Sequence, residues 1–399
     1  MPSERSSPSS PTSDPVSPAI TGDRPGHQIE TGRSGSPLSA GSAAEVALAE
    51  VVGSIGGLNG AAAEAARERD ARLTKPPGSL GRIESLAVQL AAIAGGSPAP
   101  SPEPAVVVVF AADHGVHAEG VSPWPQAVTA QMVTGICRGG AAISVITRAN
   151  GLGVQVVNAG VAVPLDDHEL LVNRPVRAGS RNLRREAALT RAEAATAALL
   201  GVEVGTRLVD ERGARCLLTG DMGIANTTPS AAVVAAITGL APADVTGRGT
   251  GIDDATLAAK TQVVADALAR LAGRPPLEPL DPLGVLAEVG GLEIAGLAGL
   301  CLAGAAARVP VVVDGVIALA GALVACALQP AVAGYLIAGH RSVEPAAGRA
   351  LDHLGLAPLL DLDLRLGEGT GAALAYPLVR AAALVAAEMA TFDDLGIDA

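Results

Sequence analysis

The sequence predicts an α/β fold: a Rossmann-like open, mostly parallel sheet with helices on both faces, plus a smaller helical subdomain built from the N- and C-terminal segments. Two observations carry this prediction. From residue 104 onward, short runs rich in β-branched residues alternate with alanine-rich segments of helical length. Nearly all of the short runs end in glycine beside a polar residue, as expected where strands lead into loops at one edge of a sheet.

Six candidate strands follow from this alternation, of which the fourth is weak: residues 105–115, 154–160, 216–223, 243–249, 309–315 and 332–340. In open parallel sheets, ligands bind in the crevice beyond the carboxyl ends of the strands. We therefore expect one site to gather the polar residues at these ends, namely Asp113, Asn158, Asp221, Asp314 and His340.

One apolar stretch, residues 316–339, carries no formal charge and is long enough to span a bilayer. It consists mostly of small residues, includes Gln329 and Pro330, and lies between Asp314 and His340. This pattern favours a buried helix followed by a buried strand over a membrane span.

The two ends of the chain lie outside the alternation. Residues 1–42 are rich in Ser, Pro and Gly, so we expect a disordered tail. Residues 43–103 are expected to form the small helical subdomain, together with the C-terminal helix. The α/β catalytic domain then covers residues 104–370, and a C-terminal helix with a short tail covers residues 371–399.

A Pro-Pro-Gly turn within residues 75–91 leads into an amphipathic helix. Its apolar face is formed by Leu80, Ile83, Leu86 and Leu90. On this pattern alone, a structural hairpin is the favoured interpretation.

Composition excludes several functional classes. The net charge of −12 over 399 residues argues against nucleic acid and anionic membranes as partners. The four cysteines show no CxxC spacing, which argues against a metal cluster or a disulfide scaffold and favours a reducing cytoplasm. His114 and His117 lack the acidic and histidine neighbours that would complete a metal site, so we expect neither metal nor cofactor.

The most informative loop lies within residues 219–239, where a strand ends in a glycine-containing turn and a helix starts near Pro229. Asn226, Thr227 and Thr228 offer capping groups, and free N–H groups at such a helix start suit one phosphate. It is not a Walker motif, because no Gly-Lys-Ser/Thr follows. An ordinary N-capped helix is the alternative interpretation.

Lys260 is the only lysine after Lys75, and arginine supplies nearly all the other positive charge. It could serve as a point-charge partner for a phosphate, or it could be a solvated lysine on a helix surface. The glycine-rich residues 247–254 fail as a dinucleotide fingerprint, because the required spacing and helix are missing.

A glycine- and proline-rich loop within residues 111–133 connects a strand to a helix. It suits a cover over the crevice, with Ser122, Trp124 and Gln131 as its candidate ligand contacts.

A single acid, Glu368, stands between two glycines directly before an alanine-rich run. It could simply mark a helix entry, with Thr370 capping a helix over residues 371–389 that is kinked at Pro377. Alternatively, the glycines leave an exposed carboxylate open to a ligand.

Six motifs occur in this order: KPPGSLGRIESLA, AADHGV followed by EGVSPWPQAVTAQMV, GDMGIANTTPSAAV, VGGLEIAGLAG, VPVVVDG and RLGEGTGAALA. Together they resemble the nicotinate-nucleotide:dimethylbenzimidazole phosphoribosyltransferase family, which builds the lower-ligand nucleotide of cobalamin. The similarity runs from about residue 45 to residue 396. The resemblance implies transfer of a 5-phosphoribosyl group from nicotinate mononucleotide to 5,6-dimethylbenzimidazole, with inversion at the anomeric carbon, by a cytoplasmic homodimer.

The resemblance also implies roles for particular residues. Glu368 matches the general base that accepts the benzimidazole proton. Asp221 stands where the family usually has Glu, and Asn158 stands where it often has Asp. The phosphate is expected on the backbone of Gly223, Ile224, Ala225, Asn226 and Thr227, with Lys260 in support. Further substrate contacts are expected from Ser122, Trp124, Gln131, Leu366 and Asp314.

Two other functions remain open from the sequence. A nucleotide sensor without catalysis would keep the crevice but would have no reason to keep Glu368, Lys260 and the expected phosphate loop within residues 219–239 together. A nucleoside phosphorylase-like enzyme would use free phosphate as its second substrate, in place of an azole base.

Overall fold

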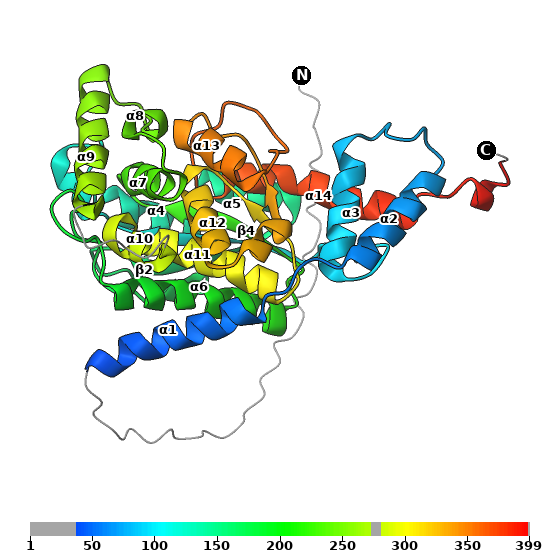
Figure 1. Ribbon diagram of the computed structural model, residues 1–399, viewed down its shortest axis with the longest axis horizontal. Helices are drawn as coiled ribbons and strands as arrows, with labels where there is room; N and C mark the ends of the chain where they lie inside the picture. Colours follow the sequence, from blue (N-terminus) through cyan, green and yellow to red (C-terminus); the bar gives the residue numbers. More distant parts are fainter. Residues whose placement is uncertain (1–36, 273–280, 398–399) are drawn as a thin grey trace, which may run out of the picture. The chain divides into compact units, whose positions relative to one another are not determined.

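Six parallel strands form one sheet in the order β3-β2-β1-β4-β5-β6 (Figure 1). The computed structural model describes residues 37–272 and 281–397. The strands are β1 (Ala105–Ala112), β2 (Gly153–Gly160), β3 (Leu171–Asn173), β4 (Cys216–Met222), β5 (Val311–Val313) and β6 (Leu336–Ala338). This is the strand order of a doubly wound Rossmann-like sheet, so the predicted fold class is confirmed.

Two details of the strand prediction were wrong. Residues 243–249 hold no strand; a short helix, α8 (Pro242–Val245), begins there instead, because proline at the first position of a helix fixes a helical φ and needs no N–H partner. The edge strand β3 was missed, because three residues are too few to show a period-2 pattern.

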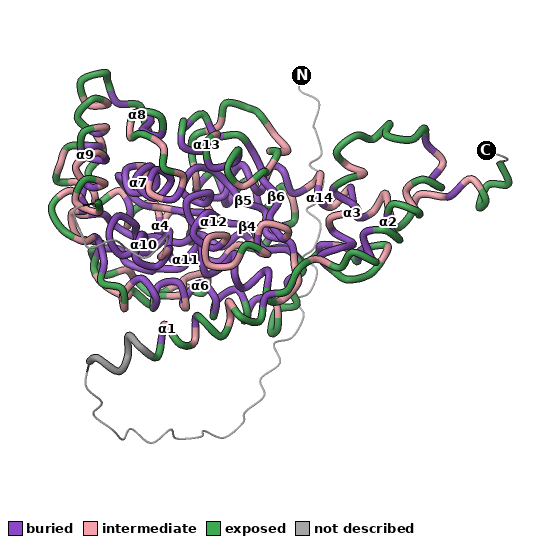
Figure 2. The backbone as a smooth tube through the Cα atoms, in the orientation of Figure 1, coloured by how far each residue is buried: buried purple, intermediate pink, exposed green. Residues whose placement is uncertain are grey.

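The sheet has a separate apolar core on each face, because successive side chains of a strand point to opposite sides. In β1, Val108 and Phe110 belong to one core and Val107 and Val109 to the other. The first core is covered by α6 (Arg191–Arg212), α7 (Thr227–Thr238), α10 (Pro282–Val289), α11 (Leu292–Ala306) and α12 (Val316–Leu328). The second is covered by α3 (Arg82–Ala94), α4 (Val128–Cys137), α5 (Ala142–Asn150) and α14 (Thr370–Glu388), and Figure 2 shows the buried segments throughout the sheet region.

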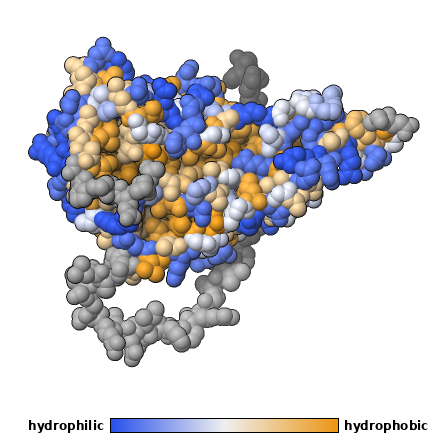
Figure 3. All heavy atoms as spheres, in the orientation of Figure 1, coloured by the Kyte–Doolittle hydropathy of each residue, from blue (hydrophilic) through white to orange (hydrophobic). Residues whose placement is uncertain are grey.

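Small residues let the helices approach closely in this aromatic-poor core. A Cβ added at Gly201 of α6 would lie 2.0 Å from the carbonyl oxygen of Gly296 in α11. The two helices therefore touch backbone to backbone. Figure 3 shows apolar residues in the middle of this face of the molecule and hydrophilic residues toward its margins.

The predicted hairpin is present as α2 (Gly60–Arg72) and α3, and α14 packs against it (Figure 1). Lys75 links the two helices, with its Nζ 3.0 Å from Asp70 Oδ2 and 2.8 Å from Glu84 Oε1. Leu86 and Leu90 are buried as predicted, whereas Leu80 precedes the helix and is exposed.

The first helix, α1 (Pro37–Ser54), packs against α6 and not against the hairpin. It begins inside the segment that we had assigned to the tail, whose residues 1–36 lie outside the described residues. The other two helices of the predicted 43–103 subdomain, α2 and α3, pack against each other and against α14, while the subdomain itself stays a prediction.

The apolar stretch 316–339 folds as α12, a 3-10 helix (η2, Pro330–Tyr335) and β6. This confirms the predicted helix before a buried strand, but the strand is shorter than the predicted 332–340, because its first residues belong to η2. Within the described residues, one helix is long and apolar enough to cross a membrane, namely α14. Half of its apolar window is buried inside the fold, as in the core helix of a globular protein.

Candidate active site

The crevice lies at the carboxyl ends of β1 and β4, where the strand order reverses. The chain leaves β1 toward β2 and β3, then returns to place β4 on the other side of β1. Open α/β sheets bind ligands at such a reversal. Here the segments after β1 and β4 touch, because a Cβ at Gly223 would lie 2.5 Å from the Ala112 carbonyl oxygen. A cavity of about 90 Å³ lies at this edge, and it is lined by residues that follow β4, β5 and β6.

The β4–α7 loop (residues 223–226) begins directly after Asp221 and Met222. Asn226 Nδ2 donates a hydrogen bond to Asp221 Oδ2 over 2.9 Å, and Ile224 N–H donates to Thr129 Oγ1 over 3.1 Å. Ala225 has a φ of +75°, an uncommon conformation for a residue other than glycine. These contacts hold the loop against the end of β4, with its backbone lining the cavity.

Lys260 extends from α9 (Asp254–Ala272) to the first residue of α7, directly after this loop. Its side chain is buried, so the interpretation as a solvated lysine is wrong. Its Nζ donates hydrogen bonds to Thr227 Oγ1 over 2.7 Å and to the Gly247 carbonyl over 2.9 Å. Burial lowers the pKa of Lys260 to about 8, although the nearby Glu344 carboxylate partly opposes the shift. The amine therefore lies beside the first turn of α7, where an anion would also be favoured.

The segment 247–251 lies over the same cavity and is held by two residues that sequence reasoning missed. Glu344 Oε1 accepts a hydrogen bond from Gly249 N–H over 2.7 Å, and Arg365 donates to the Gly249 carbonyl over 3.3 Å. A Cβ at Gly247 would lie 2.2 Å from Glu344 Oε2, which explains one glycine of this segment. The only sequence signal for Glu344 is its place before Pro345 at the start of α13 (Pro345–Leu354).

Glu368 lies in a turn of three consecutive residues with positive φ: +83° for Gly367, +62° for Glu368 and +89° for Gly369. The turn rests directly on β4, because a Cβ at Gly220 would lie 2.7 Å from the Glu368 carbonyl oxygen. Glu368 is only 4% exposed, so the expectation of an exposed carboxylate is wrong. Its Oε2 accepts a hydrogen bond from Ile143 N–H in the first turn of α5, over 3.3 Å.

Asp314, at the end of β5, holds the start of α14. Its Oδ2 accepts from Gly369 N–H over 3.2 Å and its Oδ1 from Ala372 N–H over 3.0 Å. His340 Nε2 lies 3.5 Å from the same Oδ1. The N-cap residue is Gly369 and not Thr370, whose hydroxyl donates instead to the Gly367 carbonyl. Asp314 therefore acts as a cap for the helix that carries the Glu368 turn.

Several acids lie close together at this edge, and burial raises the pKa of two of them. The pKa of Asp221 lies well above its usual value, first because of burial and then because of the charges of Asp314 and Glu293. The pKa of Glu368 is raised mainly by burial, while the hydrogen bond from Ile143 limits the rise. Burial disfavours the charged His340 ring, but the Asp314 carboxylate outweighs it and raises the pKa of His340.

Comparison with known proteins shows which family this chain resembles. A family model described as phosphoribosyltransferase matches residues 55–397. A nicotinate-nucleotide–dimethylbenzimidazole phosphoribosyltransferase of Salinispora tropica is 52% identical over 364 residues, which cover 88% of this chain and 99% of that protein. A crystal structure of the enzyme of this name from Thermus thermophilus matches with a TM-score of 0.81 and 47% identity, covering 86% of this chain and 100% of that one. This chain belongs to the nicotinate-nucleotide–dimethylbenzimidazole phosphoribosyltransferase family.

The family resemblance singled out further residues, and the structure brings only some of them to the cavity. Leu366 lines it, together with Asp221, Gly223, Ile224, Asn226 and Thr227. Four other predicted site residues do not line it: Ala225, Lys260, Asp314 and Glu368. Ser122, Trp124 and Gln131 do not line it. Trp124 is 51% exposed, and its backbone N–H donates to Ser122 Oγ over 3.3 Å. The azole contacts of these three residues remain predictions.

Two residues at the strand ends have structural partners. Asn158 accepts from Val161 N–H over 2.8 Å and donates to Asn173 over 2.8 Å. Asp113 Oδ2 accepts from Ala162 N–H over 2.8 Å. Both side chains thus hold the segment after β2, which explains why polar residues follow these strands even where no ligand is contacted.

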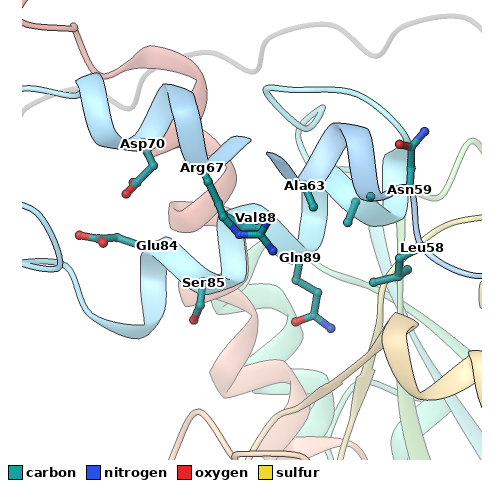
Figure 4. A pocket seen from close by; sticks show the side chains of 11 residues that line it. Leu58, Asn59, Ala63, Arg67, Asp70, Glu84, Ser85, Val88 and Gln89 are labelled. Carbon is teal, nitrogen blue, oxygen red and sulfur yellow. The ribbon is translucent and has the colours of Figure 1, made fainter. Parts of the chain in front are cut away.

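A larger cavity, of about 510 Å³, lies between α2 and α3 (Figure 4). Arg67, Asp70, Glu84 and Gln89 are among the side chains that line it. Its lining includes no residue from the strand ends and none from the β4–α7 loop, so it is separate from the cavity of about 90 Å³ described above. Within residues 37–272 and 281–397, no group of three or more His, Cys, Asp or Glu side chains could hold a metal ion.

Proposed function

We propose that this chain transfers the 5-phosphoribosyl group of nicotinate mononucleotide to 5,6-dimethylbenzimidazole or a related azole. The products are α-ribazole 5′-phosphate and nicotinate, for assembly of the nucleotide loop of cobalamin. The observation that carries the proposal is the position of Glu368, a buried carboxylate whose turn rests on β4 and whose N–H donates to the Asp221 carbonyl over 3.2 Å. Lys260 reaches Thr227, at the start of the helix that follows β4. The names of its relatives, at about half identity over nearly their whole length, give the reaction.

The 5′-phosphate is assigned to the β4–α7 loop and the first turn of α7. The N–H groups of Ile224 and Asn226 are already engaged by Thr129 Oγ1 and the Gly223 carbonyl. We therefore assign the phosphate oxygens to the N–H groups of Gly223, Ala225 and Thr227, with the Lys260 amine as the charged donor. Helix α7 adds the positive end of its dipole.

The chemistry needs one base. Nicotinate leaves from a pyridinium, so its departure removes a positive charge and requires no protonation. The attacking azole loses its N–H proton, and Glu368 accepts it while the other ring nitrogen bonds to the anomeric carbon. Attack from the face opposite nicotinate inverts that carbon and gives the α-glycosidic bond.

Entry of substrates requires an opening. The cavity of about 90 Å³ is smaller than the roughly 300 to 1,000 Å³ of most small-molecule sites. Segment 247–251 and Arg365 meet over it through the bond to the Gly249 carbonyl. We expect this contact to break when a nucleotide binds, and the loop with Ser122, Trp124 and Gln131 to cover the azole.

The enzyme is expected to act in the cytoplasm, as a homodimer and without a cofactor. The decisive experiment incubates the purified protein with nicotinate mononucleotide and 5,6-dimethylbenzimidazole, and identifies the anomer of the product by NMR. Nicotinate release that requires the azole supports the proposal. Release that requires inorganic phosphate would instead indicate a phosphorylase, and binding without release would indicate a sensor. Sedimentation of the same preparation tests the dimer.

A further inference from the structure

A histidine and a glutamate form a fully buried pair next to Gly223, directly after β4. Neither residue has a part in the proposed reaction. His114 follows β1, and Glu293 lies in the first turn of α11. The distance between His114 Nε2 and Glu293 Oε1 is 2.8 Å, and both side chains are 0% exposed. Within the described residues, neither Glu293 oxygen makes a well-aligned hydrogen bond, and the same holds for His114 Nδ1.

Such a pair costs stability where it stands. Taking two charged groups out of water is expensive, and apolar side chains of similar volume often serve the fold as well or better. Buried polar atoms without aligned partners are also uncommon in native structures. The pair is therefore better explained by a role in the site than by a contribution to folding.

The pair touches the site through the backbone of the β4–α7 loop. A Cβ at Gly223 would lie 3.2 Å from His114 Nε2 and 2.5 Å from the Ala112 carbonyl oxygen. A Cβ at Gly291 would lie 2.6 Å from His114 Cε1 and 2.7 Å from Glu293 Oε2. The His114 imidazole thus packs between the start of α11 and Gly223, and it supports the backbone of the β4–α7 loop.

Glu293 also acts on Asp221 through its charge. Asp221 is buried against Gly367, with Oδ2 bound to Asn226 and Oδ1 without a partner among the described residues. The Glu293 charge contributes to the raised pKa of Asp221. Several other titratable or charged groups lie at this edge. After the strands these are Asp113, His114, Asp314 and His340, and around the cavity and α7 they are Lys260, Glu344, Arg365 and Glu368.

We propose that Glu293, paired with His114, is a positioning residue for phosphoribosyl transfer: it supports the Gly223 backbone and disfavours a further negative charge at the buried Asp221, whose Oδ1 then donates a hydrogen bond to the nucleotide. A neutral acid suits a cavity that receives a phosphate and a nicotinate carboxylate, because an ionised Asp221 would repel both. This inference rests on the proposed function for the identity of the nucleotide.

The test measures the protonation of Asp221 directly, from the infrared C=O stretch that only a protonated carboxyl group shows. In the wild type, this band is present at neutral pH and Asp221→Asn removes part of it. Glu293→Gln keeps the shape of the side chain and removes its charge. In this variant, the Asp221 contribution to the band should disappear at a lower pH than in the wild type. Glu103→Gln is the control, since Glu103 pairs with Arg380 near the opposite end of β1. A band unchanged by Asp221→Asn, or the same titration in Glu293→Gln as in wild type, overturns the inference.

Kinetics supply a second readout and separate this inference from the proposed function. Glu293→Gln should raise KM for nicotinate mononucleotide severalfold with little change in KM for the azole, and should add nothing in an Asp221→Asn background. Asp221→Asn alone should bind the nucleotide within a few-fold of wild type, because the amide also donates. Loss of binding in Asp221→Asn would show that Asp221 must be ionised, and would overturn the inference even if Glu293→Gln does not fold. Failure of the wild type to use the nucleotide would instead refute the proposed function.

Discussion

Glu368 Oε2 accepts a hydrogen bond from Ile143 N–H, so the carboxylate before α14 is held by the N-terminal end of α5. The two residues belong to segments far apart in the chain, and both segments pack on the same face of the sheet. The positive end of α5 favours the ionised carboxylate, whereas burial favours the neutral form. The raised pKa makes the ionised Glu368 a stronger base than an ordinary glutamate, which suits a general base.

The position of this base depends on Gly220, and the first prediction concerns that residue. A Cβ there would lie 2.7 Å from the Glu368 carbonyl oxygen, which is backbone and cannot move aside without moving the turn. Gly220→Ala should therefore lower kcat much more than it changes KM for nicotinate mononucleotide. Gly96→Ala is the control, because no atom lies within 4 Å of its Cβ position and its φ is not positive. Normal turnover in Gly220→Ala would show that the turn tolerates displacement.

Sequence reasoning predicted the sheet because its signal is local. Runs such as 106–110 and 154–157 are short and consist mostly of β-branched residues, and a polar residue follows within three positions. The strand β3 and the attachment of α1 to α6 were missed for the opposite reason. Three residues carry too little pattern, and the sequence of a helix does not say which other helix it will contact.

The candidate site was predicted in part, and the errors share one cause. Glu368, Asp221 and Lys260 stand out in the sequence because of glycine context, a strand end and the scarcity of lysine, and their roles stay predictions. Glu293 and Glu344 were missed, because each is an ordinary acid at a helix start whose partner lies far away in the sequence. Exposure of Glu368 was also misjudged, since the segments that cover it cannot be read from its neighbours.

The second prediction separates the N-terminal residues from α1. Removal of residues 1–36 should leave the melting temperature and turnover nearly unchanged, because their composition cannot build an apolar core. A deletion extended to residue 54 removes α1, with the buried Leu48 and the Glu45 that pairs with Arg191. Burial of one such leucine is worth about 1.5 to 3 kcal/mol, so the longer deletion should lower the melting temperature by several degrees. Calorimetry of both proteins checks this, and an equal loss in the shorter deletion would contradict it.

The third prediction is that Lys260→Ala weakens nicotinate mononucleotide far more than the azole. Loss of a charge-assisted hydrogen bond costs about 1.5 to 3 kcal/mol, which corresponds to about a 10- to 150-fold rise in KM for the nucleotide. Gln262→Ala, on the exposed side of the same helix, is the matched control. Equal losses for both substrates would indicate that Lys260 has only a structural role between Thr227 and Gly247.

The buried amine also sets a pH dependence, which is the fourth prediction. Because the pKa of Lys260 is about 8, the cation is present below that pH and is lost as pH rises through it. In the free enzyme, kcat/KM for nicotinate mononucleotide should consequently fall above about pH 8, since this parameter reports the ionisation of the free enzyme. Lys260→Arg, whose guanidinium stays charged, should keep any remaining activity through that range. A fall of the same shape in Lys260→Arg would assign the ionisation to another group.

The last prediction concerns Glu368 itself. Glu368→Gln keeps the shape and one acceptor oxygen but cannot take a proton, so kcat should fall about 10²- to 10⁴-fold with little change in substrate binding. The sign of the pH effect follows from the raised pKa of Glu368. The base must be ionised to act, so the wild-type rate should rise with pH through an ionisation above the usual glutamate range, and the mutant should lack that rise. Azoles with a more acidic N–H should suffer least, because water can take their proton more easily. Turnover of Glu368→Gln within a few-fold of wild type for every azole would leave Glu368 as a turn residue and move the search for the base to Asp221, Asp113 and Asp314.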